Sequence, residues 1–333
     1  MRANGLDVTM ADVAKAAGVS RPLVSIVMRG VPGASDSTRQ HVMKVAAELG
    51  YVPDVRAQAL RRQGPGAVGV AFEAVQPFHA ALVDGVYETC ESAGRELVLT
   101  AVTASHDESK AIDSLLANRC GAIVAIGSGL PPRRLAQIAA LVPVVVVARA
   151  VRAEAVEYVC SDDEGSLVKV VEHLVGLGHS RICFAASPRS GGGPQRLRGY
   201  RKAMAAAALS VDVVEAGSTE QAGADAAARL LARGQLPTAV IGFNDPCAAG
   251  LQASLRQAGL RVPEDISITG FDDSAIAATP YRQLTSVRQD TARMAETAAL
   301  RAIARMEGQS ERRRSHVLPT ALTIRASTAP PPR

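Results

Sequence analysis

The chain has 333 residues, of which 47% are hydrophobic and 21% charged, and its formal net charge is +5. This composition is typical of a globular protein with more than one domain. The lack of any run of about 18 apolar residues argues against a membrane-spanning helix. The five cysteines are dispersed without a CxxC pair, and no secretory signal opens the sequence. We therefore expect no zinc site, no disulfide framework and a reducing, cytoplasmic location.

Most of the excess positive charge lies in the first 62 residues. They hold nine basic and five acidic residues, which leaves a net charge of only +1 for the rest of the chain. A basic segment of this kind is expected where a small part of a protein binds a polyanion such as DNA. A solvated basic surface without such a partner is the alternative, because charge alone does not separate the two.

The segment Met10–Gly30, MADVAKAAGVSRPLVSIVMRG, predicts two short helices joined by a tight turn. Small or apolar residues recur where the two helices would pack on each other, at Val13, Ala14, Ala17, Val19, Val24 and Val27. Thr9 or Met10 opens the first helix. Ser20 is placed as the N-cap of the second, and Pro22 falls in its first turn, where a missing N–H costs little. The pattern is typical of a helix-turn-helix motif.

Several side chains are left outside this small core and are expected to face DNA. They are Arg21, Pro22, Ser25, Ile26 and Arg29. In a helix-turn-helix motif the N-terminal end of the second helix enters the major groove, where Arg21 would contact a guanine edge or a phosphate. A plain helical hairpin inside an all-α cap, with solvated arginines, is the alternative interpretation.

Strand-like and helix-like runs alternate from Ala67 onward. The strand-like runs are AVGVAF, ELVLTAV, GAIVAIG, VPVVVVA, RICFAAS, TAVIGF and ISITGFD. Continuous apolar strands that alternate with helices indicate parallel sheets covered by helices on both faces. About 260 residues of this pattern exceed one typical domain, so we expect two similar lobes.

Nearly the whole chain resembles the LacI/GalR (lactose-repressor/galactose-repressor) family of bacterial transcription regulators. The resemblance rests on VTMADVAKAAGVSRPLVSIVMRG, STRQHVMKVAAELGYVPD and ALRR, and further along on SDDEGSLVKVVEHLVGLGHSRI, RLRGY, FNDPCAAGLQASLRQAGLRVPEDISITGFDD and LTSVRQD. It implies a repressor that binds a palindromic operator in double-stranded DNA as a homodimer or higher oligomer. It also implies a small-molecule effector, a sugar or related metabolite.

The expected fold class is therefore α/β, with a small all-α helix-turn-helix head and a two-lobed core that resembles type I periplasmic binding proteins and has parallel sheets. The expected domains are a DNA-binding head at 1–52, a hinge helix and linker at 53–65, an effector-binding and dimerisation core at 66–328, and a disordered tail at 329–333. One lobe would comprise about 66–160 with 290–317, and the other about 161–289 with 318–328.

The resemblance also assigns a role to the hinge. In the family a short helix forms on operator DNA, and a leucine from each subunit wedges into the minor groove. Leu60 matches that leucine by its spacing from Pro53, and an ordinary packing leucine is the alternative. Ala57 in the same segment, and Thr9 and Ser20 in the head, complete the expected DNA contacts.

The effector is expected at the carboxyl ends of the parallel strands, where loops and helix N-termini converge. The residues expected to bind it are Phe78, Arg149, Asp162, Arg196, Asn244, Asp272 and Gln289. The last four match effector-contact positions of the family by resemblance. Arginine, asparagine and aspartate side chains can pair with vicinal hydroxyls or with the edge of a purine. The two arginines favour an acidic sugar or a phosphate.

Some of these polar residues have structural alternatives. Asp245 precedes a proline and is as well suited to capping the next helix as to binding a ligand. Either Asp162 or Asp163 can cap the helix that follows them. Asp272 and Arg196 can simply pair with each other.

Two other classes of protein are alternatives to the repressor. The sequence has no nucleophile elbow, metal-ligand cluster or nucleotide-binding glycine fingerprint, so we expect no enzyme, no catalytic residue, no metal and no cofactor. The other class is a cytoplasmic small-molecule-binding module without specific DNA readout. The intact apolar core of the helix-turn-helix, together with Arg21 and Leu60, argues against that class.

Overall fold

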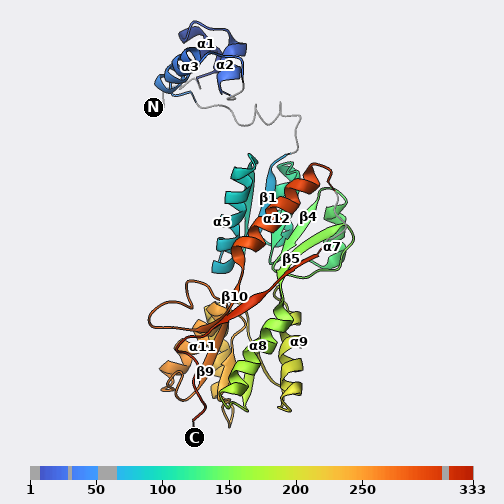
Figure 1. Cartoon of the computed structure of the whole chain (residues 1–333), viewed down its shortest axis with the longest axis vertical. Coiled ribbons are helices and arrows are strands. Elements are labelled where there is room, and N and C mark those ends of the chain that lie inside the picture. The colour runs from blue at the N-terminus through green and yellow to red at the C-terminus, as the bar shows by residue number, and fades with distance from the viewer. Residues whose placement is uncertain (1–7, 29–31, 52–65, 310–314, 333) are drawn as a thin grey trace. The chain divides into compact units, whose positions relative to one another are not determined.

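The computed structural model describes residues 8–28, 32–51, 66–309 and 315–332 (Figure 1). The chain divides into two compact units, Met1–Pro65 and Gly66–Arg333. No helix among the described residues is both long enough and apolar enough to cross a bilayer.

Within residues 8–28 and 32–51 of the first unit, the structure has three short helices, α1 (Met10–Ala16), α2 (Arg21–Met28) and α3 (Asp36–Glu48). Thr9 and Asp12 form a capping box at the start of α1, because the Thr9 hydroxyl accepts from the Asp12 N–H and the Asp12 carboxylate accepts from the Thr9 N–H. Such reciprocal bonds satisfy two otherwise unpaired donors. Gly18 has a φ of +64° in the turn before α2, a conformation that glycine adopts without strain.

Apolar side chains from all three helices form the core of this unit. Its buried members are Val13, Ala14, Ala17, Val24, Val27, Val42 and Ala46, and Val19 is half-buried against them. The predicted helix-turn-helix is confirmed, with α3 as the third wall of its core.

The second unit contains two lobes, each built on a six-stranded sheet. The first-lobe sheet has the order β11-β5-β4-β3-β1-β2, with every pair parallel, and consists of β1 (Val68–Glu73), β2 (Leu97–Val102), β3 (Ala122–Ile126), β4 (Val144–Val147), β5 (Val156–Ser161) and β11 (Ser315–Leu318). Its helices are α5 (Pro77–Ser92), α6 (Glu108–Ala117), α7 (Pro132–Ala139) and α12 (Thr291–Met306).

Strand β4 shows why this sheet is covered on both faces. Val145 and Val147 pack with residues of α5 and α12, whereas Val144 and Val146 pack with residues of α6 and α7. Successive side chains of a strand point to opposite faces, so a run of four valines requires apolar cover on both.

The second-lobe sheet has the order β12-β10-β9-β8-β6-β7 and is parallel except for the pair β10 and β12. Its strands are β6 (Ile182–Ala186), β7 (Asp212–Glu215), β8 (Ala239–Ile241), β9 (Ser267–Asp272), β10 (Thr285–Gln289) and β12 (Thr320–Thr323). Its helices are α8 (Asp163–Gly176), α9 (Gly193–Ala206), α10 (Glu220–Leu231) and α11 (Asp245–Gln257).

The chain passes between the lobes three times, from β5 to α8, from β10 to α12 and from β11 to β12 (Figure 1). Each lobe is therefore assembled from separate stretches of sequence. The predicted α/β class with two parallel-sheet lobes is confirmed.

The C-terminal segment differs from the predicted disordered tail. The Ala329 N–H donates to Ser267 Oγ at 3.0 Å, and the Ala329 carbonyl lies 2.9 Å from His179 Nε2. Ser327 is buried as well. The proline-rich composition suggested disorder, but paired backbone groups and buried polar partners hold this segment on the second lobe.

Candidate functional site

The start of α2 carries the side chains that the sequence assigned to DNA reading. Arg21 and Pro22 are exposed, and Ser25 and Ile26 are half-buried. In the described part of the chain, Arg21 makes no ion pair or hydrogen bond through its side chain. Its exposed side chain can therefore contact a partner without breaking an interaction within the described residues.

The other predicted DNA contacts of the head have structural roles. Ser20 caps α2, because its hydroxyl lies 3.4 Å from the Leu23 N–H. The Thr9 hydroxyl donates to an Asp12 carboxylate oxygen at 2.6 Å within the capping box. Three predicted contacts lie outside the described residues: Arg29, Ala57 and Leu60.

A cavity of about 360 Å³ lies between the two lobes of the second unit. The first lobe lines it with residues at the ends of β1 and β3 and the starts of α5 and α6, among them Glu73, Gln76, Phe78, His79, Glu108 and Gly127. The second lobe lines it with Arg196, Ser218, Phe243, Asn244 and Asp272, among others. Four of the seven predicted effector contacts therefore meet here.

Arg196 is held rigidly by the second lobe and is only 5% exposed. Its Nε donates to Asp163 Oδ1 at 2.9 Å, and its Nη1 donates to the Phe243 carbonyl at 2.8 Å. The guanidinium carbon lies 3.5 Å from the centre of the Phe271 ring, a cation–π contact. The alternative that Arg196 pairs with Asp272 is wrong, because Asp163 is its partner.

Asp272 is fixed by a buried relay of hydrogen bonds. Gln289 Nε2 donates to Asp272 Oδ1 at 2.8 Å, and Gln289 Oε1 accepts from the Ser161 hydroxyl at 2.6 Å. Burial raises the pKa of Asp272 to about 8, despite the opposing effect of the nearby Arg196 charge. Asp272 also has a φ of +106°, an uncommon conformation for a residue with a side chain. Gln289 thus positions Asp272 rather than lining the cavity.

Asn244 caps α11, and Asp245 does not. Asn244 Oδ1 accepts from the Cys247 N–H at 3.0 Å, while its Nδ2 donates to the Ser218 carbonyl at 3.0 Å. Asp245 is fully buried and accepts from the hydroxyls of Ser274 and Ser286 at 2.9 and 2.5 Å. Burial raises the pKa of Asp245 to about 6. Asp245 therefore braces the second lobe and has a structural role.

Two of the predicted effector contacts lie beside the cavity without lining it. Arg149 Nη1 donates to the carbonyls of Ser128 and Leu130 at 2.6 and 2.8 Å. Asp162 caps α8, where its Oδ1 accepts from the Gly165 N–H at 2.9 Å. Both side chains are occupied by backbone groups.

The first-lobe wall of the cavity is acidic. Glu73 and Glu108 line it, and burial, with the charge of Glu108, raises the pKa of Glu73. The two arginines that favoured an acidic effector are already engaged, since Arg149 binds carbonyls and Arg196 is neutralised by Asp163. The preference for an acidic sugar or a phosphate therefore loses its support.

Five of the residues that line the cavity were not among the effector contacts expected from the sequence: Glu73, Gln76, His79, Glu108 and Ser218. Position at the end of β1 was a usable signal for Glu73, Gln76 and His79. Ser218 lies in the loop before α10 and reaches the cavity only through the tertiary fold.

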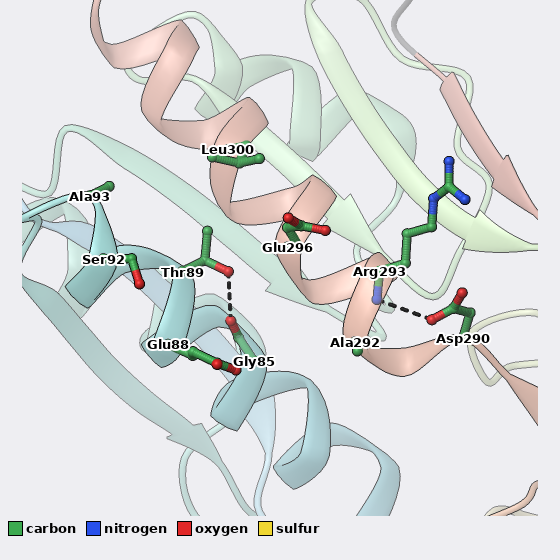
Figure 2. A pocket seen from close by; sticks show the side chains of 10 residues that line it. All are labelled: Gly85, Glu88, Thr89, Ser92, Ala93, Asp290, Ala292, Arg293, Glu296 and Leu300. Atoms are coloured by element: carbon green, nitrogen blue, oxygen red, sulfur yellow. Dashed lines mark hydrogen bonds between the residues drawn. The ribbon is translucent and has the colours of Figure 1, made fainter.

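A second, larger groove of about 920 Å³ lies between α5 and α12 (Figure 2). Figure 2 shows the short side chains of Thr89 and Ser92 on α5 and the longer Glu296 on α12. None of its lining residues is buried, and the Thr89 hydroxyl donates only to the Gly85 carbonyl of its own helix. Its size alone does not make it a site, because it gathers no buried polar groups. No cluster of potential metal ligands occurs in the described parts of the chain.

A head with a reading helix and a two-lobed core with a polar cleft define the class of ligand-responsive DNA-binding regulators. Residues 9–54 match the family described as bacterial regulatory proteins, lacI family, and residues 171–328 match the periplasmic binding protein-like domain. The regulator GalR of Escherichia coli (strain K12) is 32% identical, over 97% of this chain and 96% of that protein.

Two solved structures extend the similarity over nearly all of the chain. The lac repressor dimer bound to operator and the anti-inducer ONPF is 26% identical, covers 97% of this chain and 100% of its own, and superposes with a TM-score of 0.82. The complex of the transcriptional regulator CelR with cellobiose is 31% identical, covers 96% and 99%, and has a TM-score of 0.72. The chain belongs to the LacI family. It is a DNA-binding transcriptional regulator and not an enzyme.

Proposed function

We propose that the protein binds a palindromic operator as a homodimer and represses transcription under the control of a small metabolite in the interlobe cleft. The observation that carries the proposal is that the polar side chains of Arg196, Asn244 and Asp272 line one cavity between the two lobes. The chain crosses between these lobes three times. Each of the three side chains is more than nine-tenths buried and held by the protein, so a ligand meets a prepared site.

The head supplies the DNA contacts in this proposal. Arg21 at the exposed start of α2 reads a base edge or a phosphate in the major groove. By resemblance to the family, Leu60 wedges into the minor groove of the operator. Ala57 in the hinge and Arg29 in the head also contact the operator. A dimer follows from the two-fold symmetry of a palindrome, and the lac repressor structure is a dimer on its operator.

The effector contacts are Phe78, Arg196, Asn244 and Asp272. Gln289 supports Asp272, while Arg149 and Asp162 shape the loops around the cavity. The ligand chemistry is polyhydroxylated, as in the cellobiose complex of CelR. The proposed location is the cytoplasm, where operator DNA and a metabolite are both present.

Regulation then follows from linkage between the two binding events. If the effector and the operator prefer different degrees of lobe closure, each changes the affinity for the other by the same factor. Typical coupling free energies of about 1–3 kcal/mol correspond to a 5- to 150-fold change.

The test measures operator affinity by fluorescence anisotropy before and after addition of a pool of neutral cell metabolites. The wild type should change affinity by a factor in that range. The double variant Asp163→Asn/Arg196→Met, in which the buried pair is replaced by two neutral side chains, should bind the operator as the wild type does but ignore the pool. Loss of operator binding in the double variant, or an unchanged response, would contradict the placement of the effector.

A further inference from the structure

His79 is a polar residue of the cleft that was not among the effector contacts expected from the sequence. It lies in the first turn of α5, is 8% exposed, and lines the cavity from the first lobe. Its Nδ1 lies 3.2 Å from the backbone N–H of Glu73. A backbone N–H can only donate, so Nδ1 must be the unprotonated acceptor, and the neutral ring carries its proton on Nε2.

The Nε2 edge of the ring has room because of Gly127. A Cβ atom at position 127 would lie 2.6 Å from His79 Nε2 and 2.5 Å from His79 Cε1. Any other residue would therefore displace the imidazole, and the φ of +65° at Gly127 is also one that glycine adopts without strain. Because Gly127 has no side chain, the His79 ring can lie against the end of β3.

His79 Nε2–H has no hydrogen-bond partner among the described residues. Because His79 lines the cavity, this donor is left to water or to a ligand that enters the cavity. Burial also lowers the pKa of His79 to about 4, so the ring is neutral at physiological pH. His79 thus presents one fixed donor and no acceptor to the cleft.

The groups around this donor restrict what can bind it. Glu73 and Glu108 line the same wall, and Arg196 and Asp272 face it from the second lobe. An anionic group would be repelled by the two glutamates. An ammonium group has no lone pair to accept from His79. A neutral hydroxyl can accept from Nε2–H and donate to a carboxylate at the same time.

We propose that His79 Nε2–H donates a hydrogen bond to a hydroxyl oxygen of a neutral, polyhydroxylated effector and thereby selects the ligand at the first-lobe wall. This inference rests on the proposed effector site and names the chemistry of the group that the first lobe recognises. His79 is a specificity-determining contact in addition to the four already assigned.

Two variants separate ligand contact from structural support. In His79→Asn the side-chain oxygen can replace Nδ1 as the acceptor for the Glu73 N–H, but no donor remains at the position of Nε2. In His79→Gln the longer amide can place an N–H donor near the position of Nε2. Both variants should keep the melting temperature within a few degrees of the wild type and bind operator DNA unchanged.

The probes are neutral pentoses, hexoses and disaccharides, including D-ribose, D-galactose and cellobiose, titrated by calorimetry into the full-length protein. For each sugar that binds, His79→Asn should weaken affinity about tenfold, the value of one hydrogen bond to a buried hydroxyl. His79→Gln should lose about threefold or less. An unchanged affinity in His79→Asn, or no binding by any of these sugars, would overturn the proposal.

Monodeoxy analogues of the bound sugar identify the oxygen. One analogue should bind the wild type as weakly as the parent sugar binds His79→Asn, and for that analogue the substitution should have no further effect. Equal losses with every analogue would mean that His79 acts only through the structure. If sugars bind as expected while the wild type fails to bind any specific DNA, the repressor function fails and the role of His79 stands.

Discussion

Gln76 and Ser218 join the two lobes across the cleft. Gln76 Nε2, from the first lobe, donates to the Ser218 hydroxyl at 2.9 Å and to the Ser218 carbonyl at 3.2 Å. Asn244 donates to the same carbonyl and to Gln76 Oε1. The three residues form a hydrogen-bonded link between the lobes at the wall of the cavity.

Gln76→Ala should favour separation of the lobes, because it removes every hydrogen bond that Gln76 makes in this link. We expect the radius of gyration from small-angle scattering to increase and bound sugar to dissociate about five- to tenfold faster. Ser218→Ala is the matched control, since the Ser218 carbonyl still accepts from Gln76 and Asn244. The control should change both quantities less. Identical behaviour of Gln76→Ala and the wild type would show that the link does not hold the lobes.

Arg196 and Asp163 form a buried ion pair, so substitutions of the two residues should have non-additive effects on the free energy of unfolding. Both side chains are at most 6% exposed. Arg196→Met leaves the Asp163 carboxylate buried without its cation and should lower the free energy of unfolding by about 3–5 kcal/mol. Asp163→Asn in the same background should recover most of that loss. Urea unfolding of the four proteins in this cycle measures the coupling, and simple additivity would contradict the pairing.

The raised pKa of Asp272 predicts that the stability of the protein falls as the pH rises. Its folded pKa of about 8 lies above the ordinary value of 3.8, so the folded state holds a proton that the unfolded state releases. Its contribution to stability is full below pH 4 and is lost as the pH rises through 8. Asp272→Asn should therefore raise the melting temperature relative to wild type more at pH 8 than at pH 4. The opposite trend would mean that the carboxylate is the stable form in the fold.

Arg21→Ala should relax base preference within each operator half-site. An arginine contact with a guanine edge is worth about 1–3 kcal/mol of discrimination, so the preference for the best base should fall by about tenfold or more. Lys44→Ala on α3 removes the same charge from an exposed side chain and is the control. Binding measured on a set of single-base operator variants checks this. A uniform loss on every sequence would assign Arg21 to the phosphate backbone.

Local sequence pattern accounts for much of the fold. The buried valines of α1 and α2 and the four valines of β4 occupy the faces that their periodicity predicts, because burial of apolar surface dominates those elements. Strands β7, β10, β11 and β12 were not anticipated. Strands β7, β11 and β12 are edge strands and β10 lies next to an edge, where less apolar surface is needed.

Polar partners were harder to foresee, because they depend on contacts between distant parts of the chain. Arg196 pairs with Asp163 rather than Asp272, and Arg149 turns to the carbonyls of its neighbouring loop. The helix cap falls on Asn244 and not on Asp245, since Asp245 is buried against two serines near β10. In each case the tertiary packing determines the hydrogen-bond or ion-pair partner, and the residue type alone does not predict it.

We expect the chain to read a specific palindrome through its head. The most direct measurement is selection of bound duplexes from a random DNA pool at physiological salt, followed by footprinting of the selected sequence. We expect a short palindrome protected on both halves and distorted at its centre, with the central distortion lost in Leu60→Ala. Weak, salt-sensitive binding without sequence preference, both with and without added metabolites, would contradict the account.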